Sequence, residues 1–111
     1  MTPVIRPRAQ DDILHQFRWY LDAQDAPDAA YRFVDAVEAS VEQLVSMPNM
    51  GAPREIKNPD LAGLRFWPVS GFEDVLIFYV VRGDVLRVLR VLHGKRDIDR
   101  ILRNDADDKL H

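Results

Sequence analysis

The stretch VLIFYVVRGDVLRVLRVL, residues 75–92, decides the fold of this 111-residue chain. All seven residues of VLIFYVV are apolar, and so are six of the eight in VLRVLRVL. Both runs are rich in β-branched or aromatic residues, which predicts two strands. Arg82, Gly83 and Asp84 between them have the length of a hairpin turn centred on a glycine, so we expect the strands to pair antiparallel.

The sequence before this hairpin predicts two more strands and a long connection. LRFWPV, at residues 64–69, reads as a strand that ends in a bend over residues 70–72. The preceding segment, residues 47–63, contains three prolines and is the obvious irregular connection. A short first strand is predicted at residues 3–6.

Apolar residues at helical spacing predict three helices. The first runs from about residue 9 to residue 23, and the second from Pro27 to Ser46. Pro27 suits the first helical turn, because its missing amide hydrogen would have no partner there. A short linker joins the two helices, so we expect an antiparallel helical hairpin. A third, short helix is predicted at residues 95–103, followed by a polar tail at residues 104–111.

The resulting order is strand, two helices, three strands and a short helix, which defines an α+β fold. The chain is long enough for one ordinary domain and too short for two. The proline-containing connection is also too short to divide it. We therefore expect a single domain over residues 1–111, with no separate cofactor domain.

The composition excludes several classes of protein. The chain has no cysteine, so disulfides, thiolate zinc sites and cysteine nucleophiles are excluded. Its first residues, MTPVIRPRAQDD, lack the apolar stretch of a secretory signal, and no segment approaches the roughly 18 apolar residues of a membrane span. We expect a cytoplasmic protein that does not contact membranes.

Charge is distributed unevenly along the chain. The formal net charge is −3, but residues 82–103 hold seven lysines or arginines against three acids, whereas residues 1–46 hold four arginines against eight acids. An acidic protein is a poor general binder of phosphate backbones, because non-specific affinity comes from many basic side chains that displace counterions. Any contact with a polyanion is therefore expected in the C-terminal third.

The predicted sheet is more apolar than its own helices are expected to cover. The helical hairpin can cover one face, which leaves only the short terminal helix and the proline-containing connection for the other. A half-exposed strand would alternate apolar and polar residues, and the two central strands do not. We therefore expect part of the second face to be uncovered and another polypeptide to pack there, since large apolar patches are uncommon on monomers.

Arg87 and Arg90 interrupt the last predicted strand. They are an odd number of residues apart, so in a regular strand they point to opposite faces. An arginine among apolar neighbours is costly unless its head reaches water or an anion, so the exposed one is a candidate for binding a carboxylate or a phosphate. Alternatively, it extends to water along its apolar stem or pairs with a nearby acid.

Five motifs carry a resemblance to a known family. They are PRAQDDI (7–13), LVSMPNMG (44–51), GLRFWPVSGF (63–72), IFYVV (77–81) and RVLRVLHGKRDI (87–98). In this order the chain resembles the ParE/RelE superfamily of bacterial toxins from type II toxin-antitoxin modules, and it is most similar to the ParE branch. The resemblance implies a helical hairpin packed on a twisted, mainly antiparallel sheet. It also implies a hetero-oligomeric complex with a cognate ParD-like antitoxin, which carries a ribbon-helix-helix DNA-binding domain and a C-terminal segment that wraps and neutralises the toxin.

The superfamily that the chain resembles divides into two mechanisms. RelE-like members cleave messenger RNA on the ribosome, whereas ParE-like members are associated with poisoning DNA gyrase. For RNA cleavage this sequence offers Arg65, Arg90, His93, Lys95 and Arg96. The cations would stabilise a charged transition state, and the histidine would transfer protons. The resemblance places Arg65 and Arg90 at basic strand positions that the nuclease branch uses.

Two departures from the nuclease branch favour the non-catalytic mechanism. Nuclease-branch members commonly place a functional tyrosine near the C-terminus, and here no tyrosine follows Tyr79. They are also usually strongly basic, whereas this chain is acidic. We therefore favour a toxin that binds DNA gyrase, traps the broken DNA and needs no cofactor or metal. The alternatives are a ribosome-dependent messenger RNA endonuclease using Arg65, Arg90 and His93, and a non-toxic antitoxin-binding module.

The candidate partner-binding residues are basic or aromatic side chains of the last strands and the turn that follows them. They are Arg65, Trp67, Arg87, Arg90, His93 and Arg96. Trp67 is two residues from Arg65, so both side chains should point to the same face of the sheet, where Trp67 would border a binding groove. The alternative is that Trp67 is an ordinary core or interface aromatic. The HGKRD motif also has a structural interpretation, in which Gly94 permits a sharp exit from the strand and Asp97 suits the start of the terminal helix.

The remaining polar and aromatic residues are interpreted as structural. The acid pairs at residues 11–12 and 73–74 are assigned to a solvated surface, because adjacent acids alone do not make an octahedral magnesium site. His15 is interpreted as an ordinary surface residue, and Trp19 as a core or interface aromatic.

Overall fold

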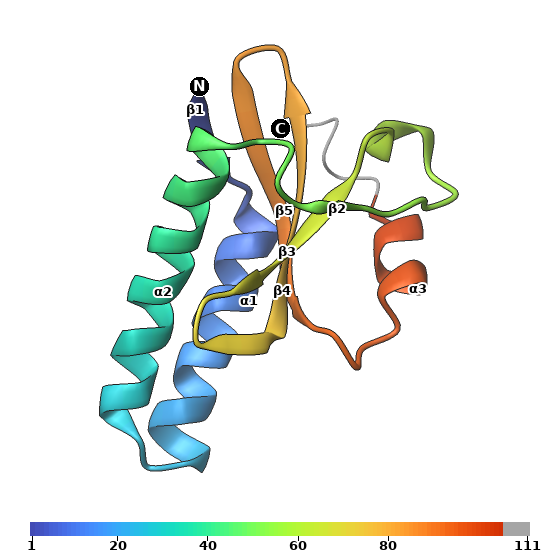
Figure 1. Ribbon diagram of the computed structural model, residues 1–111. Coiled ribbons are helices and arrows are strands. Elements are labelled where there is room, and N and C mark those ends of the chain that lie inside the picture. The colour runs from blue at the N-terminus through green and yellow to red at the C-terminus, as the bar shows by residue number, and fades with distance from the viewer. Residues whose placement is uncertain (106–111) are drawn as a thin grey trace.

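The computed structural model describes residues 1–105 of the chain (Figure 1). The strands are β1 (Thr2–Ile5), β2 (Ala52–Pro53), β3 (Arg65–Val69), β4 (Phe72–Arg82) and β5 (Val85–His93). The helices are α1 (Pro7–Arg18), α2 (Pro27–Ser46) and α3 (Ile98–Arg103), with a π-helical segment at Trp19–Ala23 and a 3-10 turn at Pro59–Leu61. Residues 106–111 of the predicted polar tail lie outside the described residues.

The strands form one sheet in the order β1-β5-β4-β3-β2. The central β4–β5 hairpin pairs antiparallel from Val75 opposite His93 to Arg82 opposite Val85, which confirms the prediction from the opening stretch. Its turn holds Gly83 at a φ of 59°, a left-handed conformation that glycine adopts without strain. β1 pairs with β5 in parallel and the other pairs are antiparallel, so the α+β fold with a mainly antiparallel sheet is confirmed.

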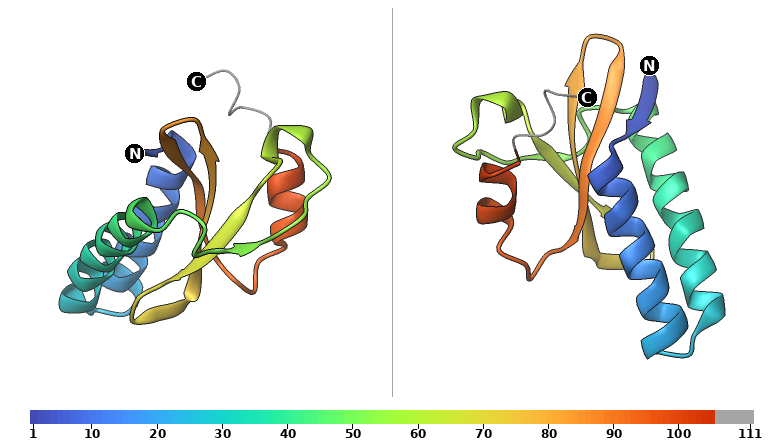
Figure 2. Two further views of the ribbon diagram at one scale, coloured as in Figure 1. Left: turned by 45° about the horizontal axis from the view of Figure 1, so that its top comes forward. Right: turned by 180° about the vertical axis from the view of Figure 1, so that it is seen from behind.

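The helical hairpin covers one face of the sheet, as Figure 1 and the right view of Figure 2 show. α2 has the predicted bounds, and α1 begins slightly earlier than predicted, at Pro7, because proline is tolerated in the first turn of a helix. Apolar stripes of the helices and one face of the sheet are buried together. This first core contains Ala9, Phe33, Val37, Val41, Leu44, Val69, Val75, Ile77, Tyr79, Leu86, Val88 and Val91.

The opposite face of the sheet is covered by α3 and by the connection that precedes β3 (Figure 2, left). The second core lies there and contains Leu61, Leu64, Phe78, Val80, Leu89, Leu92, Ile98 and Leu102, all 3% exposed or less. The Asn58 side chain donates to the Leu102 carbonyl at 3.1 Å and joins the connection to α3. The expectation of an uncovered apolar sheet face is therefore wrong, because a few apolar residues in an irregular segment suffice to cover it.

The strands differ from their predicted bounds mainly at polar ends. β4 begins at Phe72, so the bend is reduced to Ser70 and Gly71. Glu73 and Asp74 belong to β4 but are polar and exposed. The apolar run at residues 75–81 therefore did not show that the strand begins earlier. β2 lies within the predicted irregular connection and has only two residues.

The last helix begins later than predicted, at Ile98 instead of residue 95. β5 continues to His93, and a turn separates it from the helix. The Asp97 carboxylate accepts from the Arg100 amide at 3.3 Å and caps the helix N-terminus, as its place before the helix suggested. None of the helices between residues 1 and 105 has the length and apolar character needed to span a lipid bilayer.

Candidate functional site

The two arginines of β5 project from the same face of the sheet. Arg87 pairs with Val80 and Arg90 with Phe78, and both of these partners belong to the second core. The register shifts beside Phe78, so that Leu89 has no partner residue and β5 carries a β-bulge. The expectation that Arg87 and Arg90 point to opposite faces is therefore wrong, because the bulge reverses the alternation of side chains.

Arg90 is held by an acid of α1. Its Nε and Nη2 donate to the two carboxylate oxygens of Asp12 at 2.7 and 2.9 Å, and Asp12 also accepts from the Val91 amide at 3.0 Å. The two side chains are only 13% and 12% exposed, so this two-pronged pair is largely shielded from water. The alternative in which an arginine pairs with a nearby acid therefore holds for Arg90, and assigning Asp12 to the solvated surface is wrong.

Arg87 lines a cavity of about 490 Å³ together with Arg6 and Arg82. Arg82 donates to the carbonyls of Asp60 and Ala62 at 3.1 and 2.8 Å, and Arg6 is only 3% exposed. The Arg87 side chain is half-buried and makes no hydrogen bond or ion pair within residues 1–105. Asp60 also lines this cavity, so three guanidinium groups surround it against one carboxylate, and the net positive potential favours an anion.

A second arginine-lined cavity, of about 360 Å³, lies between α1, β5 and α3. Arg8, Arg90, Arg96 and Arg100 line it, and Asp97 is its one carboxylate among the described residues. Arg96 and Arg100 are exposed, and their side chains have no hydrogen-bond or ion-pair partner in the described part of the chain. We call the arginines of the two cavities the arginine face: Arg6, Arg8, Arg82, Arg87, Arg90, Arg96 and Arg100.

The arginine face is basic although the protein as a whole is acidic. Most of its members come from the C-terminal third, where the charge distribution predicted contact with polyanions. Arg6 and Arg8 were missed, because they are brought there by the parallel pairing of β1 with β5, which no local pattern indicates.

Arg65 lies on the other face, where it holds the connection after α2. Its Nη1 donates to the Gly51 carbonyl at 2.6 Å and to the Asn49 carbonyl at 3.3 Å. The neighbouring Tyr79 hydroxyl donates to the Pro48 carbonyl at 2.7 Å and accepts from the Gly51 amide at 3.0 Å. Burial raises the pKa of Tyr79, against the lowering effects of the Gly51 hydrogen bond and of the Arg65 charge. In this structure Arg65 therefore stabilises a loop.

The three residues of the nuclease alternative do not converge. Arg65 pairs with Tyr79 of the first core and Arg90 with Phe78 of the second core, so their side chains project from opposite faces of the sheet. His93 lies at the last position of β5 and lines a different cavity from Arg90. These residues therefore do not place a base and two cations around one scissile phosphate.

The two tryptophans have different surroundings. Trp67 projects from the same face as Arg65, as its parity predicts, and packs half-buried against the first core. Trp19 is 44% exposed, and its ring meets that of Tyr20 at 5.0 Å. A role of Trp67 at the border of a binding groove stays a prediction.

The HGKRD motif forms the turn between β5 and α3. The His93 Nδ1 accepts from the Lys95 amide at 3.3 Å, and the Gly94 amide donates to the Asp74 carbonyl at 2.8 Å. This geometry fits the structural interpretation of the motif. However, Gly94 does not have a positive φ, and a Cβ there would meet Leu76 Cδ1 at 3.4 Å, an ordinary contact. The chain exit therefore does not require a glycine.

An apolar groove of about 640 Å³ runs between α1 and α2, next to β1. Its apolar walls are Pro3, Ile5, Ile13, Leu14, Phe17, Val34, Val37 and Val41. Leu14 is 44% exposed, and Gln10, Glu38 and Glu42 are the polar residues that line the groove. The open apolar surface expected on the sheet is thus found on the helical hairpin. The sequence signal for this surface was the pair of consecutive apolar residues Ile13 and Leu14. The pair makes the apolar stripe of α1 wider than one face.

The edges of the sheet offer a partner little main chain to pair with. The amides of Thr2 and Arg6 donate inward to the β4–β5 hairpin at 2.9 and 3.0 Å, so the alternate residues Pro3 and Ile5 face outward. Pro3 has no amide hydrogen, and the Ile5 carbonyl already accepts from the Gln10 side chain at 2.9 Å. β2, at the other edge, has two residues, the second of which is proline. The helical hairpin is therefore the more open surface.

The fold matches a solved structure, and the sequence matches a family model. The solved structure described as "Chromosomal ParDE TA system from P. aeruginosa" has a TM-score of 0.68 and 22% sequence identity, and the match covers 84% of this chain and 95% of that chain. The fold is therefore ParE-like. The sequence model of the family described as "ParE toxin of type II toxin-antitoxin system, parDE" matches residues 4–98. The chain belongs to this family of toxins. No curated protein matches it.

Metal binding was not predicted from the sequence. Between residues 1 and 105, no group of three or more histidine, cysteine, aspartate or glutamate side chains is placed to hold a metal ion. That the protein needs neither metal nor cofactor stays a prediction.

Proposed function

We propose that this protein is a toxin that a cognate antitoxin neutralises by filling the groove between α1 and α2. Membership of the ParE toxin family supports the class of partner. The groove is the observation that carries the proposal, because the second sheet face is covered by the chain itself and the sheet edges are largely blocked. The groove also leaves a large apolar side chain in water, because Leu14 is 44% exposed.

The groove suits a single amphipathic helix of the antitoxin. Such a helix presents apolar residues at i, i+3, i+4 and i+7 to a groove between two helices. Glu38 and Glu42 at the groove favour a basic residue beside that apolar stripe. We infer that the helix belongs to a ParD-like antitoxin with a ribbon-helix-helix domain, in a hetero-oligomeric complex.

Calorimetric titration of the antitoxin into a groove variant tests this assignment. Leu14→Lys places a charge in the groove without altering either core, because Leu14 is 44% exposed. We expect the Kd to rise by about tenfold or more, since the lysine must be desolvated on binding. Met47→Lys is the matched control, because Met47 is 60% exposed and does not line the groove. Equal affinities of the two variants would place the antitoxin elsewhere.

We also propose that DNA gyrase is the target and that the toxin inhibits it without catalysing a reaction. Arg65 and Arg90, on which the nuclease alternative depends, project from opposite faces and each already binds groups of the protein itself. Arg87 and Arg96 on the arginine face have no such partners within residues 1–105, so they are the candidate contacts with the target.

Growth inhibition by variants expressed without antitoxin tests the role of the arginine face. Arg87→Ala and Arg96→Ala are expected to lose toxicity while the protein stays folded, because neither side chain supports the structure. Arg18→Ala is the control, since Arg18 is an exposed arginine of α1 outside the arginine face. Full toxicity of both variants would contradict this role, and ribosome-dependent cleavage of messenger RNA without any effect on gyrase would contradict the target. Absence of toxicity in the unaltered protein would identify a non-toxic antitoxin-binding module.

A further inference from the structure

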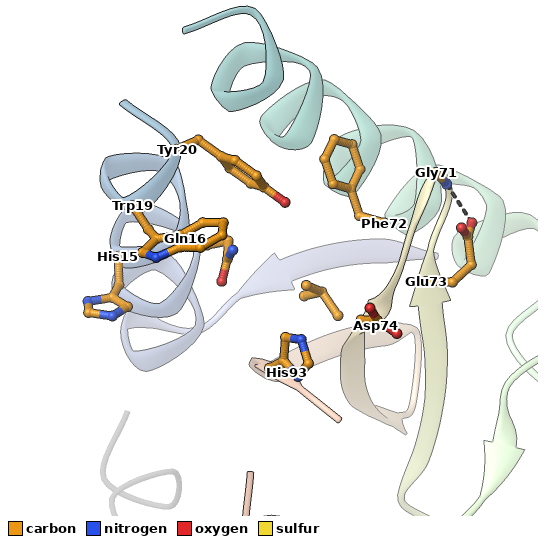
Figure 3. A pocket seen from close by; sticks show the side chains of 10 residues that line it. His15, Gln16, Trp19, Tyr20, Gly71, Phe72, Glu73, Asp74 and His93 are labelled. Carbon is orange, nitrogen blue, oxygen red and sulfur yellow. Dashed lines mark hydrogen bonds between the residues drawn. The ribbon is translucent and has the colours of Figure 1, made fainter. Parts of the chain in front are cut away.

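A cavity of about 590 Å³ lies beside the C-terminal part of α1 (Figure 3). α1 and the π-helical segment contribute His15 and Trp19, β4 contributes Phe72 and Asp74, and β5 contributes His93. Its volume is in the range of sites that bind small groups. None of its lining residues belongs to the apolar groove or to the arginine face.

The π-helical segment shapes one wall of the cavity. The Gln24 amide donates to the Trp19 carbonyl at 3.2 Å, and the Ala26 amide donates to the Tyr20 carbonyl at 2.8 Å, so the turns are wider than in an α-helix. The rings of Trp19 and Tyr20 meet edge to face at 5.0 Å, and both residues line the cavity. π-Helical turns of this kind are rare and frequently lie at functional sites.

Other aromatic rings hold this wall in place. The Tyr20 ring lies 5.9 Å from that of Phe33 and 5.8 Å from that of Phe72, and the last two rings are 5.4 Å apart. Phe33 is fully buried, whereas Trp19 stays 44% exposed. The indole is thus supported from behind by packed rings and open to solvent at the cavity. A supported, open aromatic ring is the type of surface that binds cations through its π-face.

The opposite wall is acidic. Asp74 points its carboxylate toward the cavity in Figure 3, and Glu73, whose carboxylate is turned to Gly71, also lines the cavity. One Glu73 oxygen accepts from the Gly71 amide at 2.5 Å, and neither acid has an ion-pair partner within residues 1–105. No lysine or arginine of that range lines the cavity. The wall therefore favours a cation and repels phosphates and carboxylates.

We propose that this cavity binds an arginine side chain of a protein partner. A guanidinium group is planar and charged, so it stacks on the Trp19 indole while its N–H groups donate to the Asp74 carboxylate. A lysine ammonium has the charge but lacks the plane that stacks and the fork of donors that matches a carboxylate. The imidazoles of His15 and His93 border the same space and add hydrogen-bonding atoms.

The position of the cavity favours a side chain carried by a protein over a free cation. Trp19, Glu73 and Asp74 are exposed, so the cavity is a surface depression that a small free cation would occupy only weakly. α1 also lines the apolar groove through Leu14 and Phe17. A protein already seated on α1 would present an arginine there without a second loss of translational freedom. The inference does not depend on whether gyrase is the target.

Nuclear magnetic resonance of the two indole N–H groups tests the proposal directly. The probe is Nα-acetyl-argininamide, and its neutral isostere Nα-acetyl-citrullinamide is the control ligand. Trp67 is the internal reference, because it packs on the first core and does not line the cavity. We expect the Trp19 signal to shift in a saturable way with millimolar affinity for the arginine probe, while the citrulline probe and the Trp67 signal show no shift.

A pair of acid-to-amide variants tests the role of the carboxylate. Asp74→Asn is expected to weaken binding of the arginine probe by about threefold or more, because the charge-assisted hydrogen bond is lost. Asp35→Asn, at an exposed position of α2 outside the cavity, is expected to leave binding unchanged. Equal shifts of Trp19 with the arginine and citrulline probes, no shift with either, or stronger binding of inorganic phosphate would each overturn the proposal.

Discussion

Arg87 and Arg90 project from one face of the sheet although they are an odd number of residues apart in β5. The β-bulge at Leu89 accounts for this, because it inserts one residue and reverses the alternation of side chains. Without the bulge, Arg90 would point into the first core beneath the helices. With it, Arg90 reaches Asp12 of α1, and the arginines of β5 join those of α1 and α3 in the arginine face.

The Arg90–Asp12 pair is expected to couple α1 to the sheet. Arg90→Leu or Asp12→Leu alone should lower the free energy of unfolding by about 3 kcal/mol, because each removes one member of a largely shielded, two-pronged ion pair. The double variant should lose much less than the sum, as urea unfolding of the four proteins would show. Arg54→Ala, which breaks an exposed pair with Asp99, should cost about 0.5 kcal/mol. Strictly additive losses would mean that the pair contributes no coupling.

Gly51 is expected to be required for the contact between the connection and β4. In Gly51→Ala the new Cβ would lie 2.7 Å from Tyr79 Cε1 and 2.9 Å from the Phe66 carbonyl oxygen. Relieving this overlap in a packed region should cost about 1–3 kcal/mol. Gly94→Ala is the control, because its Cβ would meet only ordinary contacts such as Leu76 Cδ1. Thermal unfolding should show a lower Tm for Gly51→Ala, and equal Tm values would refute this packing argument.

Alkaline pH is expected to weaken the fold through Tyr79. Burial raises the pKa of Tyr79 above its ordinary value of 10.0, so the folded protein retains the proton at pH values where the unfolded chain has lost it. The stability linked to this proton is full below the unfolded pKa and falls as pH rises from there through the folded pKa.

Tyr79→Phe isolates this effect, because it lacks the titrating group. The variant should be less stable than the wild type by about 1 kcal/mol near neutral pH, since the hydrogen bond to Pro48 is lost. Urea unfolding at about pH 8 and about pH 11 should show that the difference narrows at the higher pH. A difference that stays constant would show that Tyr79 does not titrate differently in the two states.

The outer edge of β1 is expected to resist strand addition because of Pro3 and Gln10. The double variant Pro3→Val/Gln10→Ala restores an amide donor and frees the Ile5 carbonyl, which makes the edge able to pair with another chain. Light scattering should show a mean mass that rises with concentration more steeply than for the wild type. Thr2→Val is the control, because its amide already donates inward. Unchanged association of the double variant would mean that other features protect the edge.

Local patterns were sufficient to predict the two hairpins. The apolar runs at residues 75–92 and the helical spacing of α2 depend only on neighbouring residues, and both elements were predicted correctly. The register between β4 and β5, in contrast, could not be predicted from neighbouring residues. The bulge at Leu89 depends on how β4 and β5 pack between two layers, so the faces of Arg87 and Arg90 were predicted wrongly.

The placement of the candidate surfaces depended on contacts between distant segments. Leu61 and Leu64 cover the second sheet face from a segment that has no periodicity, so the sheet was wrongly expected to be open. The groove on the helical hairpin depends on how α1, α2 and β1 pack together, which the spacing within each helix does not reveal. The positive charge of the C-terminal third was visible in the sequence, whereas the contribution of Arg6 and Arg8 was not.

The most direct measurement is the amount of cleaved DNA that accumulates with purified gyrase. It tests both the proposed inhibition of gyrase and the neutralisation of the toxin by its antitoxin. The purified protein and its Leu14→Lys variant are each incubated with gyrase and plasmid, with and without the cognate antitoxin. We expect both proteins to cause accumulation of cleaved DNA, and the antitoxin to suppress it for the unaltered protein much more strongly than for Leu14→Lys. No cleaved DNA with either protein, or equal suppression of both, would contradict the account.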